Sequence, residues 1–141
     1  LEICLQRFPK LIFCGHSQPF WAEMGEYDGV EPRFGYPEGP VKEGRIPQLM
    51  RKYPNLYGDL SANSGAKALI RDRAYGVKFI NEFQDRLMFG MDLCQPAAER
   101  SWHALLPPYL KELRDSGEIS KEVFEKLERK NAIRVLKLDV K

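Results

Sequence analysis

The sequence predicts an α/β fold with a parallel sheet. Three short apolar runs typical of strands, at residues 10–14, 56–61 and 86–90, alternate with segments whose apolar residues recur at helical spacing. Strands that are separated by helices pair in parallel through right-handed crossovers. Two of the runs lead, through a glycine, to a residue that can bind metal or move a proton, His16 and Asp92. The active groups of α/β enzymes commonly lie at such strand ends.

The segments before the strands have the marks of helices. Residues 1–8 read as the end of an amphipathic helix that stops at Pro9. Residues 46–53 place their apolar side chains on one face, which predicts the second helix. A third helical stretch, with a break near Asp72, runs to about Phe83.

The chain after Asp92 is predicted to be helical. We expect one helix over residues 98–106 and a second from Pro107 to Gly117. A third helix is predicted to be capped by Ser120, and the last to begin at Asn131.

Two stretches lack a clear period. Residues 63–65 read as a turn. Residues 17–44 combine prolines and glycines with aromatic residues such as Trp21. Loops of this length are usually functional or disordered, and the aromatic content argues against disorder. We therefore expect residues 17–44 to form a long active-site loop.

Composition limits the class of protein. With 141 residues, 43% of them hydrophobic, the chain is long enough for one domain, residues 1–141. Its 22 basic and 20 acidic side chains form no basic stripe, so nucleic acid is not an expected partner. Three cysteines without paired spacing favour a reducing, cytoplasmic setting. No apolar run approaches the roughly 18 residues of a membrane span.

Alternation along the strands groups the polar side chains. Cys14 and His16 share one face of the first strand, Asp59 and Ser61 share one face of the second, and Asp92 shares a face with Gly90 after the third. The three polar strand ends are therefore expected to converge.

Each of these residues also has a structural interpretation. His16 fits a hydrogen-bonded residue at a strand end, and Asp92 fits a helix N-cap. Asp59 fits a carboxylate that anchors a loop by accepting backbone N–H bonds. Cys14 fits a small core residue better than a ligand for a soft metal.

Two architectures share the predicted order of elements. A complete eightfold α/β barrel needs about 250 residues, so three strands would supply somewhat under half of one. A small doubly wound sheet normally has a glycine-rich phosphate loop, and none of the three strand-to-helix turns contains one.

The chain resembles the C-terminal half of the amidohydrolase-related family of metal-dependent (β/α)8 TIM barrels. The segments that carry this resemblance, in order, are Phe8-Pro9-Lys10-Leu11-Ile12-Phe13-Cys14-Gly15-His16, Tyr53-Pro54-Asn55-Leu56-Tyr57-Gly58-Asp59-Leu60-Ser61, Asp85-Arg86-Leu87-Met88-Phe89-Gly90-Met91-Asp92 and Asn131-Ala132-Ile133-Arg134-Val135-Leu136. The resemblance implies the C-terminal part of a barrel, and an activity of hydrolysis or non-oxidative decarboxylation.

The resemblance also implies roles for single residues. Asp92 is similar to the aspartate after the eighth strand, which ligates the metal and can relay protons. His16 is similar to the sixth-strand histidine, which binds a second metal or contacts bound water or substrate. Gly44 and Arg45 resemble a pair that holds a substrate carboxylate, although they lie farther from His16 here. We expect Arg45 and Trp21 to contact the substrate.

The expected cofactor is a divalent metal, zinc first among the candidates. The family's His-x-His pair on the first strand and its fifth-strand histidine are absent from this chain. Because a catalytic zinc takes about three protein ligands, we expect the chain by itself to bind metal poorly.

The expected function is therefore metal-dependent hydrolysis of a small carboxylate or cyclic molecule, with decarboxylation as the alternative. A different hypothesis is a non-catalytic truncated barrel that self-associates into a homo-oligomer to cover its exposed strand edges.

Overall fold

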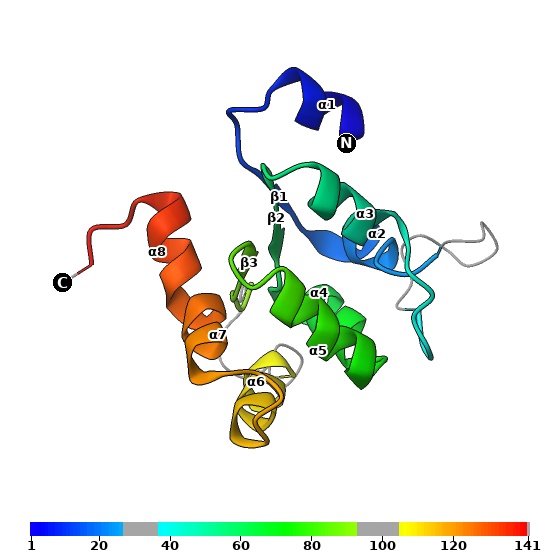
Figure 1. Ribbon diagram of the computed structural model, residues 1–141, viewed down its shortest axis with the longest axis vertical. Helices are drawn as coiled ribbons and strands as arrows, with labels where there is room; N and C mark the ends of the chain where they lie inside the picture. Colours follow the sequence, from blue (N-terminus) through cyan, green and yellow to red (C-terminus); the bar gives the residue numbers. More distant parts are fainter. Residues whose placement is uncertain (27–36, 93–104, 141) are drawn as a thin grey trace.

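A computed structural model describes residues 1–26, 37–92 and 105–140 of the chain. It confirms the α/β class, with a parallel sheet and surrounding helices (Figure 1). The strands are β1 (Phe13–Gly15), β2 (Leu56–Asp59) and β3 (Leu87–Met88). The helices are α1 (Glu2–Arg7), α2 (Ser17–Ala22), α3 (Arg45–Lys52), α4 (Ala62–Ile70), α5 (Arg73–Glu82), α6 (Leu106–Asp115), α7 (Lys121–Glu125), the π-helical turn η2 (Lys126–Lys130) and α8 (Asn131–Leu136).

The sheet has the order β1-β2-β3, with both pairs parallel. Gly58 of β2 lies opposite Gly15 on one side and Leu87 on the other. Successive strands are therefore neighbours, as expected for consecutive β/α units. Because all three strands run the same way, their C-terminal ends meet at one edge of the sheet. This arrangement agrees with part of a TIM barrel.

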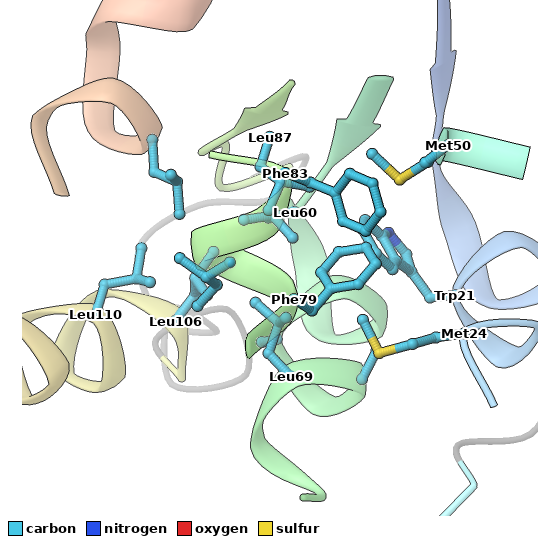
Figure 2. Packing of buried hydrophobic residues seen from close by; sticks show 14 of the residues in the cluster. Trp21, Met24, Met50, Leu60, Leu69, Phe79, Phe83, Leu87, Leu106 and Leu110 are labelled. Carbon is cyan, nitrogen blue, oxygen red and sulfur yellow. The ribbon is translucent and has the colours of Figure 1, made fainter. Parts of the chain in front are cut away.

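The core lies between the sheet and the helices that follow its strands. Figure 2 shows the rings of Phe79 and Phe83, both on or just after α5, between Trp21 on one side and Leu60 and Leu87 on the other. The centroids of the two phenylalanine rings are 4.7 Å apart. All five side chains are at most 2% exposed, so this cluster removes a large apolar area from water.

Two buried asparagines tie irregular backbone to the sheet. The Nδ2 group of Asn55, just before β2, donates to the carbonyl oxygens of Leu5, Phe8 and Leu11 and so holds α1 and the following turn. Asn131 at the start of α8 donates to the carbonyls of Gln84, at 2.7 Å, and Leu87, at 2.8 Å.

The C-terminal helices pack beside β3. Figure 1 shows α7 and α8 on the opposite side of the strands from α2 and α3. Within η2 the carbonyl of Leu127 accepts a 2.9 Å bond from the N–H of Phe89. In a regular α-helix this carbonyl would accept a bond from within the helix. In the π-helical turn it instead accepts a bond from the chain that leaves β3.

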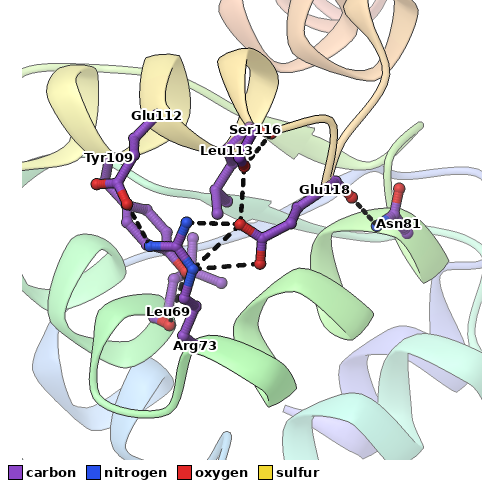
Figure 3. Close-up of polar contacts among 8 residues, drawn as sticks. All are labelled: Leu69, Arg73, Asn81, Tyr109, Glu112, Leu113, Ser116 and Glu118. Carbon is purple, nitrogen blue, oxygen red and sulfur yellow. Dashed lines mark hydrogen bonds and ion pairs between the residues drawn. The ribbon is translucent and has the colours of Figure 1, made fainter.

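A charged network connects α5 with α6 and the turn after it (Figure 3). The guanidinium of Arg73 donates to the carboxylates of Glu112, at 2.6 Å, and Glu118. The hydrogen bond from the guanidinium of Arg73 lowers the pKa of Glu118, and the hydroxyl of Ser116 lowers it further. The network is exposed, so it orients α6 more than it stabilises the fold.

Several expected elements differ from the structure. The segment 17–44 is not a loop throughout, because residues 17–22 form α2. Residues 63–65 lie inside α4 and not in a turn. The helix expected over residues 98–106 lies largely outside the described residues. Among the described helices, none has the length and apolar character needed to cross a bilayer.

Removing the side-chain amide of Asn131 should destabilise the fold. In Asn131→Ala the buried carbonyl of Leu87 and the partly buried carbonyl of Gln84 lose their donor, which is expected to cost about 1–3 kcal/mol of unfolding free energy. Urea unfolding followed by tryptophan fluorescence measures this cost. The matched control is Asn81→Ala, whose amide also donates to two carbonyls, of which the one on Glu118 is exposed. Equal losses in the two variants would contradict the assigned role of Asn131.

Candidate active site

Polar side chains meet at the C-terminal edge of the sheet. His16 directly follows β1, Asp59 ends β2, Ser61 lies two residues further on, and Asp92 lies beyond β3. Because the strands are parallel and in register, these residues come together although they are far apart in the sequence. The expected convergence of the three strand ends is confirmed.

The imidazole of His16 lies between two carboxylates. Its Nδ1 is 3.0 Å from Oδ2 of Asp59, and its Nε2 is 3.7 Å from Oδ2 of Asp92. The first is a close contact between an imidazole nitrogen and a carboxylate oxygen, whereas the second distance is too long for a hydrogen bond. The side chains of His16 and Asp92 are 40% and 50% exposed, so the Nε2 side of the ring is open to small molecules.

Ser61 completes a hydrogen-bonded group around Asp59. Its backbone N–H donates to Oδ1 of Asp59 and its hydroxyl donates to Oδ2, both at 2.9 Å. The same hydroxyl oxygen is 3.2 Å from Nδ1 of His16. The loop-anchoring interpretation of Asp59 is therefore correct, but the same carboxylate also contacts the histidine.

The backbone at this site adopts an uncommon conformation. Four non-glycine residues of the described chain have positive φ, and three of them are Ser17, Ala62 and Asp92, with φ of 77°, 57° and 53°. Ser17 and Ala62 directly follow His16 and Ser61, and Asp92 is itself a polar residue of the site. Left-handed backbone costs about 1–2 kcal/mol for a residue with a side chain, and such conformations cluster at functional sites.

Two close contacts support the site from beneath and beside it. A Cβ atom on Gly90 would lie 2.9 Å from Cβ of Ser61 and 3.3 Å from Oδ1 of Asp59, so only glycine lets the chain after β3 approach this closely. On the other face of β2, the indole N–H of Trp21 donates to the carbonyl of Asp59 at 2.9 Å. A Cβ on Gly58 would meet the same indole ring at 2.9 Å.

Trp21 and Arg45 are not brought into this group. Trp21 is 2% exposed, so it acts on the site through the backbone of Asp59 rather than through a surface. The guanidinium of Arg45 lies 3.3 Å from a carboxylate oxygen of Glu2. Arg45 lines a hollow of about 350 Å³ whose lining includes neither His16 nor Asp92. Its expected contact with a substrate carboxylate remains a prediction.

Cys14 lies one layer below His16 on the same face of β1. It is exposed in the described structure and not a core residue, whereas Phe13 and Gly15 on the other face of the strand are partly buried. The pKa of its thiol is raised to about 11, mainly by desolvation and also by the negative charge of Asp59. A thiol with this pKa is almost wholly protonated at neutral pH and is a poor nucleophile.

The donor atoms suit a divalent cation in kind but not in number. His16 and Asp92 offer an imidazole nitrogen and a carboxylate oxygen, whereas Asp59 is already engaged by Ser61 and His16. Across the described ranges, no three His, Cys, Asp or Glu side chains gather in a way that could hold a metal ion. These residues alone therefore do not make a metal site.

Comparison with known families assigns the chain. A sequence model of the family described as Amidohydrolase matches residues 5–138. The chain belongs to the amidohydrolase family, whose members fold as TIM barrels and are generally metal-dependent. No curated protein and no solved structure matches the chain.

The sequence placed Asp59 and Ser61 on one strand face but did not select them as site residues. The signal available was their spacing of two residues at the end of β2, level with His16 in a parallel sheet. Cys94 and His103 lie outside the described residues.

The raised pKa of Cys14 predicts slow alkylation. In a Cys94→Ala background, Cys14 should react with iodoacetamide more slowly at pH 8 than Cys4, which is also exposed, and its rate should rise steeply toward pH 11. Asp59→Asn removes a charge that raises this pKa, so the rate at pH 8 should increase by less than about tenfold. Peptide mass spectrometry measures both sites, and Asp85→Asn is the charge-matched control. Equal rates at Cys14 and Cys4 would contradict the prediction.

The incomplete donor set predicts weak metal retention. The 141-residue chain, purified without chelator and then dialysed, should hold much less than one equivalent of zinc by elemental analysis, since a catalytic zinc takes about three protein ligands. A stoichiometric zinc that resists dialysis would show that other residues of this chain complete the site.

Proposed function

We propose that the protein is a metal-dependent hydrolase that acts on a small carboxylate or cyclic substrate. The observation that carries the proposal is the pair formed by Nε2 of His16 and Oδ2 of Asp92, 3.7 Å apart and partly exposed at the C-terminal edge of a parallel sheet. Membership of a family that is generally metal-dependent supports the class of reaction.

The metal would be held only in part by the residues seen here. Asp92 is the first candidate ligand, zinc is the expected ion, and the remaining ligands must come from outside the described residues. When bound, such an ion supplies Lewis acidity that makes water easier to deprotonate.

The chain's own residues would handle protons. An imidazole and a carboxylate within 4 Å of each other can take a proton from a water molecule and return it to a leaving group. Both groups are partly exposed, so a small substrate can reach them without rearrangement of the described backbone. The proposed substrate is accordingly a small molecule.

Loss of either group should slow turnover strongly. In the full-length protein supplied with zinc or manganese, His16→Gln and Asp92→Asn are expected to lower kcat by about 10²–10⁴, the usual contribution of a general acid or base. The assay is a panel of small amides, lactones and aromatic carboxylates, with ring opening or amide cleavage and carbon dioxide release measured separately. The control is Asp85→Asn, since Asp85 is exposed and contacts Lys126.

The outcomes separate the alternatives. Hydrolysis that depends on His16 and Asp92 supports the proposal. Carbon dioxide release without hydrolysis overturns it in favour of decarboxylation. No turnover of any class, together with a stable homo-oligomer in solution, overturns it in favour of a non-catalytic barrel segment.

A further inference from the structure

We propose that Asp59 is a positioning residue that holds His16 in the tautomer protonated at Nδ1, so that the lone pair of Nε2 faces Asp92. The inference deepens the proposed function, because it states which nitrogen of His16 accepts the proton. It rests on the contacts that one carboxylate and one hydroxyl make with the imidazole ring.

The carboxylate of Asp59 is oriented by two bonds from Ser61. Its Oδ1 accepts the backbone N–H of Ser61 and its Oδ2 accepts the hydroxyl, each at 2.9 Å. The backbone of Asp59 is held as well, since its carbonyl accepts the indole N–H of buried Trp21. These three bonds fix the position of Oδ2 independently of His16.

Oδ2 of Asp59 lies 3.0 Å from Nδ1 of His16. An ionised carboxylate can only accept hydrogen bonds. If Nδ1 carried a lone pair, two acceptors would face each other at this distance, which is unfavourable. A proton on Nδ1 makes the same close contact favourable, because an N–H then faces a negatively charged oxygen.

Ser61 offers the one competing donor in this group. Its hydroxyl oxygen is 3.2 Å from Nδ1 of His16 and 2.9 Å from Oδ2 of Asp59, and it has a single proton to give. If that proton went to Nδ1, the hydroxyl bond to Oδ2 would be lost and Oδ2 would face a lone pair. With the proton on Nδ1, Oδ2 of Asp59 faces a donor on each neighbour, and this contact at 3.0 Å outweighs the 3.7 Å approach of Nε2 to the carboxylate of Asp92.

The consequence lies on the other side of the ring. In the neutral imidazole, a proton on Nδ1 leaves Nε2 as an acceptor. Nε2 then faces Oδ2 of Asp92 at 3.7 Å, and the two acceptors together attract a proton or a cation between them. Asp59 thereby prepares Nε2 to act without a change of tautomer, which is how an orienting carboxylate assists a general base.

The tautomer can be read directly by NMR. The chain contains two histidines, so a ¹⁵N-labelled sample gives two imidazole patterns, and His103→Gln assigns them. At alkaline pH, on the plateau where the spectrum no longer changes, the pattern of His16 is expected to be that of the Nδ1–H form. A pattern dominated by the Nε2–H form overturns the proposal, and this measurement needs no variant at the site.

Asp59→Asn should reverse the tautomer. The amide oxygen is expected to take the place of Oδ1, where it still accepts the N–H of Ser61, which puts the NH₂ group where Oδ2 faced His16. The NH₂ group then donates to Nδ1, and the ring must carry its proton on Nε2. An unchanged tautomer in a folded Asp59→Asn variant also overturns the proposal.

Two controls separate positioning from folding. Ser61→Ala removes the hydroxyl near both groups but leaves the carboxylate of Asp59 facing Nδ1, so the Nδ1–H form should remain the main one. Asp85→Asn changes the same charge away from the site and should leave the spectrum unaltered. Reversal of the tautomer in Asp85→Asn would show that the effect is not specific to Asp59 and would overturn the assignment.

The kinetic expectation follows from the spectrum. In the assay above, Asp59→Asn should lower kcat by about 10²–10⁴ with little change in KM, because the wrong nitrogen carries the proton. The NMR result is obtained without substrate or metal. Failure of the proposed hydrolysis therefore leaves the tautomer assignment standing, and a wrong tautomer leaves the need for Asp92 untouched.

Discussion

The position of strand β2 is the constraint on which the site depends. It is hydrogen-bonded to a parallel strand on both sides, so its register decides how the ends of β1 and β3 are aligned. One face rests on the buried ring of Trp21, and the other carries Asp59. Any shift of one residue would exchange these faces and remove Asp59 from His16.

The backbone of the site is strained in three turns. Ser17, Ala62 and Asp92 each hold a left-handed conformation in the turns that present the polar groups. Gly90 allows a backbone approach that any side chain would block. The tertiary contacts around them, in particular the packing of Phe79 and Phe83, must offset this cost, so the core and the site are energetically linked.

Sequence patterns succeeded where the signal is local. The break at Asp72 is real, since its carboxylate accepts the N–H of Tyr75 and caps α5, and the hydroxyl of Ser120 caps α7 in the same way. Patterns failed where a distant neighbour changed the outcome. Residues 17–22 form a helix because they pack on the sheet through Trp21, which composition alone does not show.

The ends of the chain show the same limit. Leu136, which has the spacing of a packed residue, is 61% exposed, and the last helix is tied to the chain around β3 by polar bonds from Asn131 and Arg134. The same limit applies to ion pairs, since the partner of Arg45 is Glu2, which lies 43 residues earlier in the chain. Neither the bonds of Asn131 to the chain around β3 nor the ion pair of Arg45 with Glu2 has a local sequence signature.

The sequence by itself determined the α/β class, the order of the strands, and the placement of His16 and Asp92 at one edge of a parallel sheet. Strand alternation and helix periodicity depend on near neighbours, and both are readable without coordinates. Only the tertiary structure decided that Asp59 and Ser61 hold His16, that Trp21 supports them from the core, and that Arg45 lies elsewhere. Those contacts join residues tens of positions apart, and their geometry is set by strand register and side-chain packing, which no local pattern encodes.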